Sequence, residues 1–288
     1  MRVCVIVPTY NEAGSIAGLL SRLLASPVNA DVLVVDDGSP DGTAGIVRGV
    51  AARYPGRVRV LCREKKLGIG SAYLLGFRHA LDAGYDAVVQ MDADGSHDPG
   101  FLPALLAELE TCDAVVGSRY VDGGSTPGWP ASRRAISRIG CLYARTVLGL
   151  SIRDATGGFK AFRATALRSL EGVAIRSSGF CFQAAVSYWL SRLGCRIGEV
   201  PIEFRDRETG RSKLSLVMLA EGFVTVLALR LADARARAES RTLRFRRGRP
   251  ARQGRTDTPA FRGSAAPRDE SRIRSAAGIA AARYQRRR

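Results

Sequence analysis

Short apolar runs alternate with amphipathic stretches through the first 120 residues, and this alternation limits the possible folds more than any other feature of the chain. Continuous apolar runs are typical of parallel strands that are buried on both faces. They cover residues 3–7, 31–35, 58–61, 87–91 and 114–116. Helical spacing of apolar residues separates them, over residues 16–24, 44–54, 71–83 and 99–110. We therefore predict an α/β fold with a mostly parallel central sheet and helices on both faces.

The rhythm changes after residue 120, where longer loops separate the elements. We predict helices over residues 135–148, near 182–193 and over 214–231, a turn followed by a strand within 154–162, and a strand over 197–204. The net charge of +17 is concentrated from residue 232 onward, where 17 arginines face 5 acidic residues, with no sustained periodicity beyond about residue 236. These features predict one folded domain, residues 1–231, and a basic disordered tail, residues 232–288.

Cysteine usage and hydropathy indicate the compartment. The six cysteines are scattered and include no C-x-x-C pair, which is typical of a reducing compartment rather than of disulfides or zinc. A strand follows the N-terminus directly, so we expect no signal peptide. No apolar run approaches the roughly 18–20 residues that span a bilayer, and the nearest, 214–232, is interrupted by Glu221 and Arg230. We expect a cytoplasmic protein without a membrane span of its own.

Two acidic residues follow the predicted strand 87–91, in the sequence VVQMDADGSHDP. In open α/β sheets, ligands bind at the carboxyl ends of the strands. Asp92 and Asp94 would supply hard oxygen ligands for Mg²⁺ or Mn²⁺, which would in turn hold the phosphates of a substrate. The alternative is a polar loop that caps the helix beginning near Pro99, with Asp98 as its N-cap. The two residues alone leave both interpretations open.

Polar clusters also follow the predicted strands 3–7 and 31–35, at the same edge of the sheet. Tyr10, Glu12 and Asp37 suit hydrogen bonding to the base and ribose of a nucleotide, while a metal would serve its diphosphate. Helix caps and turns are the alternative. No G-x-G-x-x-G sequence follows the first strand and no Walker A sequence is present, so dinucleotide and P-loop sites are not expected.

Cationic residues in the later loops lie apart from any single helix face. They are Arg119, Arg133, Arg134, Arg207, Arg211 and Lys213. Guanidinium groups suit phosphate oxygens, although solvated surface charge is the alternative for any single arginine. His97, in the loop after the acidic pair, suits a ligand, a base or neither, and His79 in a helical pattern is expected to be structural.

Six motifs, in order along the chain, resemble a known family. They are VPTYNE (7–12), VDDGSPDGT (35–43), REKKLGIG (63–70), MDAD (91–94), GSRY (117–120) and EVPIE (199–203). Together they resemble the polyprenol (dolichol) phosphate mannosyltransferases of glycosyltransferase family 2 over about residues 3–230. The first and fourth motifs are typical of family 2 in general. REKKLGIG and EVPIEFRDRETGRSK are typical of the polyprenol-phosphate branch, and nothing in the tail matches.

The resemblance implies a GT-A fold and the transfer of mannose from GDP-mannose to a polyprenyl monophosphate, with inversion. By position, it implies that the guanosine is held by Pro8, Tyr10, Glu12, Val35 and Asp37. The metal would be bound by Asp92 and Asp94, with the Ala93 backbone nearby and Ser96 as a weak neutral ligand where some relatives have Gln. Donor or acceptor phosphates would be contacted by Arg119, Arg207 and Lys213. Catalysis would depend on Asp92, Asp94 and Arg119.

The chemistry of such an acceptor removes the need for a dedicated base. The second pKa of a phosphate monoester is about 6, so near pH 7 the acceptor is largely an anionic nucleophile. A metal and cationic side chains stabilise the leaving diphosphate. We therefore do not assign His97 as a catalytic base. Loss of Asp92 or Asp94 is expected to abolish turnover, and loss of Asp37 to weaken donor binding more than the chemical step.

A lipid acceptor implies a membrane surface. The predicted helix 214–231 suits the membrane interface, with a core or partner-packing helix as the alternative. The arginine-rich tail suits anionic lipid at about 1 kcal/mol per basic residue, with a plain solvated tail as the alternative. Nucleic acid is not expected, because aromatic residues are nearly absent from the tail. Some relatives depend on partner subunits, which leaves a small membrane partner protein open. We expect peripheral association with the cytoplasmic face of a membrane.

Three other functions compete with this interpretation. The nearest is a glucosyltransferase that uses UDP-glucose and the same lipid phosphate, since the sequence does not reveal base and sugar selection. A transferase acting on a polysaccharide is disfavoured by the cations of RDRETGRSK, which suit a phosphate acceptor. A catalytically silent nucleotide-sugar-binding protein is disfavoured by the intact Asp92 and Asp94.

Overall fold

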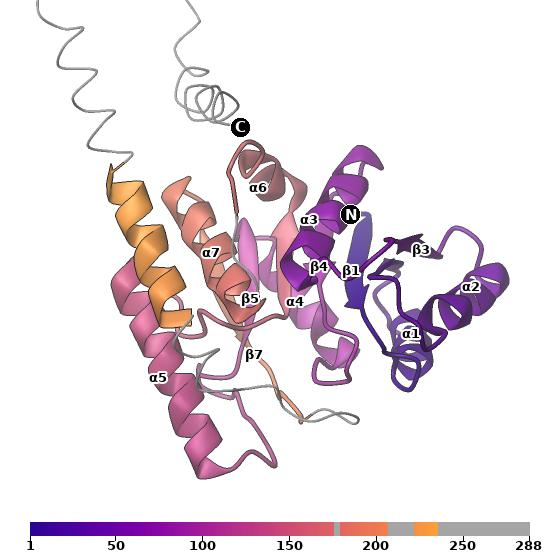
Figure 1. The fold of residues 1–288 in the computed structure, drawn as a ribbon, viewed down its shortest axis with the longest axis horizontal. Coiled ribbons are helices and arrows are strands. Elements are labelled where there is room, and N and C mark those ends of the chain that lie inside the picture. Colours follow the sequence, from indigo (N-terminus) through magenta and orange to yellow (C-terminus); the bar gives the residue numbers. More distant parts are fainter. Residues whose placement is uncertain (176–178, 207–221, 236–288) are drawn as a thin grey trace, which may run out of the picture. The chain divides into compact units, whose positions relative to one another are not determined.

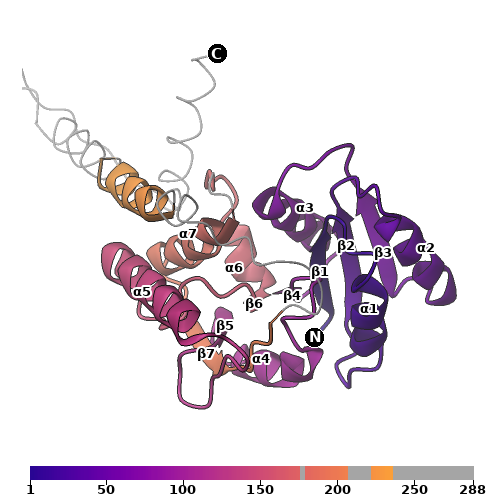
Figure 2. The ribbon, with the colours of Figure 1, turned by 60° about the horizontal axis from the view of Figure 1, so that its bottom comes forward.

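The computed structural model describes residues 1–175, 179–206 and 222–235 (Figures 1 and 2). Contacts divide the chain into two units, Met1–Glu171 with Ile175–Leu229, and Gly172–Ala174 with Arg230–Arg288. The sheet lies in the first unit. Three predictions fall outside the described residues: the first part of the helix 214–231 (residues 214–221), the tail beyond residue 235, and the cations Arg207, Arg211 and Lys213. Residues 222–235 are helical.

A seven-stranded sheet forms the centre of the first unit. Its strands are β1 (Val3–Thr9), β2 (Asp31–Asp36), β3 (Val58–Cys62), β4 (Ala87–Gln90), β5 (Ala114–Ser118), β6 (Lys160–Arg163) and β7 (Ile197–Pro201). Their order in the sheet is β3-β2-β1-β4-β6-β5-β7. Strand β6 runs antiparallel to both β4 and β5, and all other pairs are parallel. The prediction of a mostly parallel sheet is confirmed.

Helices cover both faces of this sheet, as predicted. One apolar cluster joins the sheet to α1 (Ile16–Leu24), α2 (Thr43–Arg53) and α4 (Leu102–Glu108). On the other face a second cluster joins it to α3 (Ile69–Asp82), α6 (Ala164–Ser169) and α7 (Gly179–Arg192). The long helix α5 (Ala131–Leu148) packs with α7 in a third cluster. Among the described helices, none combines the length and the apolar character that crossing a bilayer requires.

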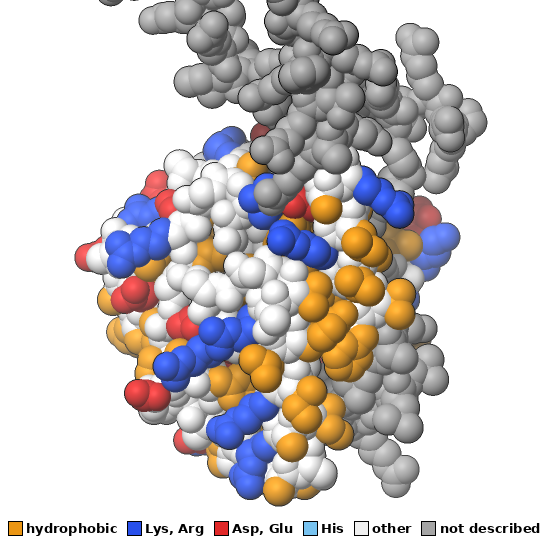
Figure 3. Space-filling view, turned by 90° about the vertical axis from the view of Figure 1, so that its left-hand side faces the viewer, with side chains coloured by type: hydrophobic (Ala, Val, Ile, Leu, Met, Phe, Trp, Pro, Cys, Tyr) orange, Lys and Arg blue, Asp and Glu red, His pale blue; other side chains and the backbone are white. Residues whose placement is uncertain are grey.

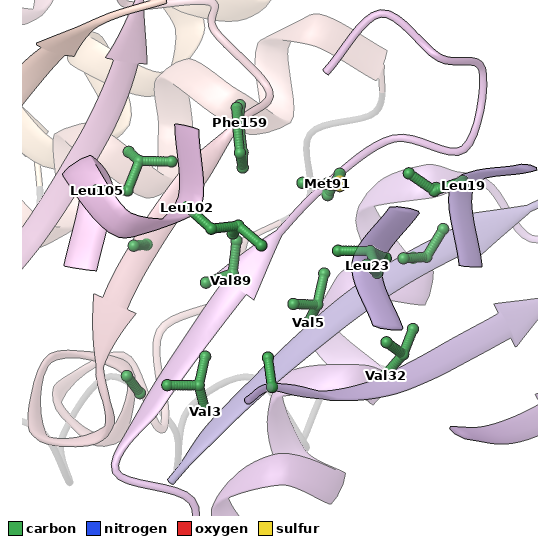
Figure 4. Close-up of a cluster of buried hydrophobic side chains, with 14 of the residues drawn as sticks. Val3, Val5, Leu19, Leu23, Val32, Val89, Met91, Leu102, Leu105 and Phe159 are labelled. Atoms are coloured by element: carbon green, nitrogen blue, oxygen red, sulfur yellow. The ribbon is translucent and has the colours of Figure 1, made fainter. Parts of the chain in front are cut away.

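Alternation along β1 explains how one strand serves two cores. Val3 and Val5 belong to the same apolar cluster as Leu19 and Leu23 of α1, and Figure 4 shows Val5 beside Leu23. The intervening residues of the strand belong to the opposite cluster with α3. Helix α3 approaches the strand closely at Gly76, where a Cβ atom would lie 2.4 Å from Cγ2 of Ile6. A glycine is therefore required for this helix to lie against the sheet.

Some element boundaries differ from the prediction. We expected Pro8 to end the first strand, but β1 continues to Thr9. Pro8 faces Val35 of β2, while the last partner in β4 is opposite Ile6. Pro8 therefore lies beyond the β4 ladder, where a missing N–H leaves no sheet bond unmade. The final strand stops at Pro201 instead of residue 204, because its partner β5 ends opposite it at Ser118.

The helices show smaller differences. The predicted helix 99–110 is a 3₁₀ turn, Pro99–Phe101, followed by α4. The 3₁₀ turn is capped by Asp98, whose side chain accepts a hydrogen bond from the Gly100 N–H at 2.9 Å. This confirms the N-cap that the alternative, capping-loop interpretation assigned to Asp98. The cap does not involve Asp92 or Asp94, so it leaves their role open. The short helix α6 was not predicted.

Candidate active site

The site lies where the direction of strand addition reverses. From β1 the chain adds β2 and then β3 on one side, and β4 pairs with β1 on the other. The crevice outside the carboxyl ends of the strands at such a switch point is where open α/β sheets bind ligands. The structure brings to this edge the predicted residues that lie at or just after the ends of β1, β2 and β4: Pro8, Tyr10, Glu12, Asp37, Asp92, Ala93, Asp94 and Ser96.

Asp92 is held in place by two neighbours. The hydroxyl of Tyr73, on α3, donates a hydrogen bond to Oδ1 of Asp92 at 2.7 Å. The backbone N–H of Asp92 donates to Nδ1 of His97 at 3.0 Å. Tyr73 is fully buried and its ring stacks on Phe182 at 6.0 Å. Burial, together with Asp92, raises the pKa of Tyr73, so the hydroxyl remains a donor and orients the carboxylate.

His97 packs beneath the loop that carries Asp92, between aromatic rings. Its buried ring stacks on Phe159 at 5.1 Å and meets the edge of Phe204 at 5.5 Å. Burial lowers the pKa of His97, and a neutral imidazole that accepts at Nδ1 carries its proton on Nε2. Of the roles left open for His97, the structure favours the structural one, since Nδ1 is used to fix the Asp92 backbone.

Asp94 is positioned by its own loop. Its Oδ1 accepts hydrogen bonds from the N–H of Ser96 at 3.1 Å and from the Ser96 hydroxyl at 2.6 Å. Ser96, which was predicted to be a weak metal ligand, thus donates a hydrogen bond from its hydroxyl to Asp94. Ala93 is buried in the apolar cluster below the loop, so only its backbone can face a ligand.

The donor set fits a hard divalent cation. Two carboxylates leave one strand end together, and a Cβ atom on Gly158 would lie 3.3 Å from Oδ2 of Asp92. The glycine keeps space open over that oxygen. Among the described residues no group of three His, Cys, Asp or Glu side chains could hold a metal. Mg²⁺ is usually bound by one or two carboxylates, with waters and substrate phosphates completing its shell, which matches the pair Asp92 and Asp94.

Asp37 anchors the glycine-rich loop 63–70. One of its carboxylate oxygens pairs with the guanidinium of Arg63. The other accepts the N–H groups of Leu67 and Gly68 at 3.1 and 3.0 Å. Asp37 is only 4% exposed. Asp37, which the sequence predicted to bind the nucleoside, therefore also connects the loop after β3 to the loop after β2.

The other residues predicted to bind the nucleoside lie at the same edge of the sheet. The ammonium of Lys66 lies 4.1 Å from the ring centroid of Tyr10. Glu12 accepts a hydrogen bond from the Ser15 hydroxyl at 2.7 Å, and its N–H donates to Thr43. Val35 is fully buried. Pro8 is half-buried at the end of β1.

Arg119 is paired inside the protein. Its Nε and Nη2 each donate to a carboxylate oxygen of Asp154 at 2.7 Å, and Nη2 also donates to Thr156 at 3.0 Å. Burial disfavours both charges, but their mutual attraction prevails: the pKa of Asp154 is lowered and that of Arg119 is raised. Asp154 therefore balances the charge of Arg119 inside the protein.

Aromatic rings connect Arg119 to the acidic loop. The Phe204 ring lies 5.3 Å from the Arg119 guanidinium and 5.5 Å from the His97 ring. Arg133 lies 4.0 Å from the Trp129 ring centroid and pairs with Asp206 at 2.8 Å. The Phe204 ring thus lies between Arg119 and His97 of the loop that follows β4 (residues 91–98).

Sequence reasoning missed three supporting residues: Tyr73, Asp154 and Phe204. The signal for Tyr73 was a hydroxyl on an otherwise apolar buried helix face, three residues after the glycine-rich loop. The signal for Asp154 was its position just before the glycine pair of DATGG, because an acidic residue at such a turn is a candidate partner for a buried cation. For Phe204 no local signal distinguishes it from an ordinary core residue.

The fold matches solved glycosyltransferases. The glucosyl-3-phosphoglycerate synthase of Mycobacterium tuberculosis, solved with Mn²⁺, UDP-glucose and phosphoglyceric acid, superposes with a TM-score of 0.60. The match covers 80% of this chain and 79% of that chain at 21% sequence identity. At this level of identity the similarity defines the fold, which is the GT-A glycosyltransferase fold, confirming the predicted class.

Sequence comparisons place the chain within that class. Residues 4–170 match the profile of Glycosyl transferase family 2. The chain is 49% identical over 241 residues to the undecaprenyl-phosphate mannosyltransferase of Micrococcus luteus, covering 82% of this chain and 99% of that protein. It is 42% identical to the polyprenol monophosphomannose synthase of Mycolicibacterium smegmatis over 215 residues, 74% of this chain and 81% of that protein. The chain belongs to glycosyl transferase family 2.

Proposed function

We propose that the chain transfers mannose from GDP-mannose to a polyprenyl monophosphate, with inversion and with the help of Mg²⁺ or Mn²⁺. The observation that carries the proposal is the 49% identity to an undecaprenyl-phosphate mannosyltransferase over nearly its whole length. The site geometry supports it: Asp92 and Asp94 lie at the switch point of a GT-A sheet, in the place where a nucleotide diphosphate and its metal would bind.

Two carboxylates would hold the metal, which when bound would neutralise the charge that develops on the leaving diphosphate. Tyr73 and the Asp92 N–H contact with His97 fix the first carboxylate, and Ser96 fixes the second. These hydrogen bonds hold both ligands in place before substrate arrives, so less ordering is needed on binding.

The nucleoside would lie over the loops after β1 and β2. Tyr10 would offer a ring face and Glu12 a carboxylate, and Pro8, Val35 and Ala93 would contribute backbone. Asp37 would bind the nucleoside by exchanging one of its present contacts with Arg63, Leu67 or Gly68. Because Asp37 also binds Leu67 and Gly68 of the loop after β3, donor binding and the position of that loop are coupled. The Lys66 ammonium over Tyr10 would have to leave the ring face when a base stacks there.

The acceptor phosphate would lie beside Arg119, with Arg207 and Lys213 as further contacts. At pH 7 the monoester is itself largely the nucleophile, so these donors need only orient it in line with the anomeric carbon. A lipid acceptor also implies peripheral attachment to the cytoplasmic face of a membrane, aided by the arginine-rich tail or a small membrane partner protein; nucleic acid is not an expected partner.

Transfer of labelled sugar tests the proposal. Purified full-length chain, Mn²⁺ or Mg²⁺ and a short polyprenyl phosphate are incubated separately with radiolabelled GDP-mannose and UDP-glucose. We expect label in the lipid phase from GDP-mannose alone, and none with Asp94→Asn. Asp98→Asn is the matched control: it changes a nearby carboxylate that caps the 3₁₀ turn, and it should keep activity.

Each other outcome identifies a competing function. Label from UDP-glucose alone would identify the chain as a glucosyltransferase with the same fold and the same site. No transfer from either donor, even with native membranes present, would favour a silent nucleotide-sugar-binding protein. Equal activity in Asp94→Asn would refute the role given to the acidic pair.

A further inference from the structure

We propose that Gln183, on α7, binds the hexose of the donor, and that the space over Gly158 receives one hydroxyl group of that hexose. This inference rests on the proposed function in one respect, since it assumes that the ligand is a nucleotide joined to a sugar. The residues predicted from the sequence serve the nucleoside, the metal and the phosphates, and none of them was assigned to the sugar itself.

The space over Gly158 is bordered by three side chains. A Cβ atom on this glycine would lie 3.2 Å from Cε1 of His97, 3.3 Å from Oδ2 of Asp92 and 3.7 Å from Nε2 of Gln183. Gly158 and Asp92 are half-buried, whereas His97 and Gln183 are 1% and 5% exposed. The glycine therefore leaves a small space at the candidate site, where a carboxylate oxygen and an amide nitrogen face the same point.

The orientation of the Gln183 amide follows from its neighbours. Nε2 of the fully buried Gln90, on β4, donates hydrogen bonds to the Gly158 carbonyl at 3.0 Å and to Oε1 of Gln183 at 2.6 Å. Because a backbone carbonyl can only accept, Gln90 must present its NH₂ group, and Gln183 must present its oxygen to Gln90. Nε2 of Gln183 is therefore the end that faces the space over Gly158.

This amide nitrogen is a buried donor that lacks an acceptor. Among the described residues, none accepts a hydrogen bond from Nε2 of Gln183. A buried donor that is left unpaired destabilises a fold, and the large majority of such groups have a partner. A hydroxyl group of a ligand in the space over Gly158 would supply the missing acceptor.

The backbone of Gln183 is also held in place. Nζ of the buried Lys160, on β6, donates to the Gln183 carbonyl at 2.7 Å and to the Ser187 hydroxyl at 2.9 Å. On the outer side of α7, α5 and the helical residues 222–229 pack in the third apolar cluster. Figure 3, which views the molecule from this side, shows apolar side chains gathered beside basic ones. Gln183 is thus fixed before a ligand arrives, so little ordering is needed on binding.

The polarity of the space favours a hydroxyl group over a phosphate. An anionic phosphate oxygen at this point would be repelled by the nearby carboxylate of Asp92. A hydroxyl group can accept a hydrogen bond from Nε2 of Gln183 and donate one at the same time. The hexose of a nucleotide sugar is joined directly to the diphosphate, which would lie at the metal site of Asp92 and Asp94. Its hydroxyl groups are therefore close enough to reach Gln183.

Calorimetric titration of the full-length chain tests the inference without any transfer step. With Mn²⁺ present and no acceptor, the affinity for GDP-mannose is compared with that for GDP, and the affinity for UDP-glucose with that for UDP. Gln183→Leu and Gln183→Met remove the donor at similar side-chain size. We expect each variant to lower the affinity for the nucleotide sugar about tenfold, because one hydrogen bond to the hexose is lost. The affinity for the nucleotide alone should remain at the wild-type value.

Cys181→Ala is the matched control. Cys181 is buried on the same helix, and its thiol faces the Gly222 carbonyl at 3.7 Å instead of the space over Gly158. This variant changes the packing of α7 without touching the sugar contact, so both affinities should equal those of wild type. An equal loss for nucleotide and nucleotide sugar in both Gln183 variants would overturn the inference, because the role of Gln183 would then be structural. Unchanged affinities in both variants would overturn it as well.

The two nucleotide pairs separate this inference from the proposed function. If wild type binds UDP-glucose and not GDP-mannose, the proposed donor is wrong. The selective loss in the Gln183 variants is then expected for UDP-glucose against UDP, which supports the sugar contact independently of the donor. If the loss is absent for whichever nucleotide sugar wild type binds, the inference fails even where labelled mannose is transferred.

Discussion

Replacing Asp154 by asparagine tests the buried pair at the edge of the site. The substitution keeps the size of the side chain but removes the charge that balances Arg119, which is 8% exposed and holds both carboxylate oxygens at 2.7 Å. Breaking a buried ion pair from one side costs about 3–5 kcal/mol, because a buried charge is left uncompensated. For a domain of this size, 1 kcal/mol corresponds to about 2–4 °C in Tm, so we expect Tm to fall by roughly 10 °C.

Denaturant unfolding and calorimetry measure this loss. The folded pKa of Asp154 is lowered, so the stabilisation is fully present above the ordinary carboxyl pKa of about 4 and is lost as the pH falls through the lower folded pKa. The difference between wild type and Asp154→Asn should therefore be constant from pH 5 to 8 and shrink in acid. The charge-free double variant Arg119→Met/Asp154→Leu should recover part of the loss. A single-variant loss below about 1 kcal/mol, or a double variant that is less stable than Asp154→Asn, would refute the reasoning.

Three further predictions follow from buried polar groups. Burial lowers the pKa of Lys160 to about 7, so the buried charge reduces the free energy of unfolding below pH 7, and this loss fades as the pH rises toward 10.5. Lys160→Met should therefore raise the free energy of unfolding by up to about 5 kcal/mol at pH 6, with the gain vanishing near pH 10. An unchanged dependence of stability on pH in the variant would contradict this. Tyr73→Phe should weaken Mn²⁺ binding about 10-fold or more in calorimetric titration with GDP present, while the matched loss of a tyrosine–carboxylate bond in Tyr85→Phe, which removes the contact with Asp31, should not. Asp37→Asn should raise the KM for GDP-mannose more than it lowers kcat, and should speed amide exchange over residues 63–70; protected exchange there would show that Asp37 does not anchor the loop.

The sheet and the acidic pair were predictable because their signals are local. Continuous apolar runs identify buried strands, and Asp92 and Asp94 follow such a run directly. The carboxyl ends of parallel strands lie at one edge of the sheet, so the loops after β1, β2 and β4 were expected to lie close together.

The supporting contacts were not predictable, because they join residues far apart in the chain. Tyr73 reaches Asp92 across 19 positions, and Arg119 reaches Asp154 across 35. The placement of β6 between β4 and β5, antiparallel to both, depends on packing that no single segment encodes. The continuation of β1 through Pro8 likewise depends on where the β4 ladder stops.

The stereochemistry of the product decides whether the chain is an inverting mannosyltransferase acting on a lipid phosphate. Lipid extracted after incubation of the full-length chain with GDP-mannose and a short polyprenyl phosphate is analysed by mass spectrometry and by NMR of the anomeric carbon. We expect one mannose joined to the lipid phosphate as the β anomer, with one GDP released for each molecule formed and no product from Asp94→Asn. Free mannose, an α anomer, or label on any acceptor other than the phosphate would contradict it.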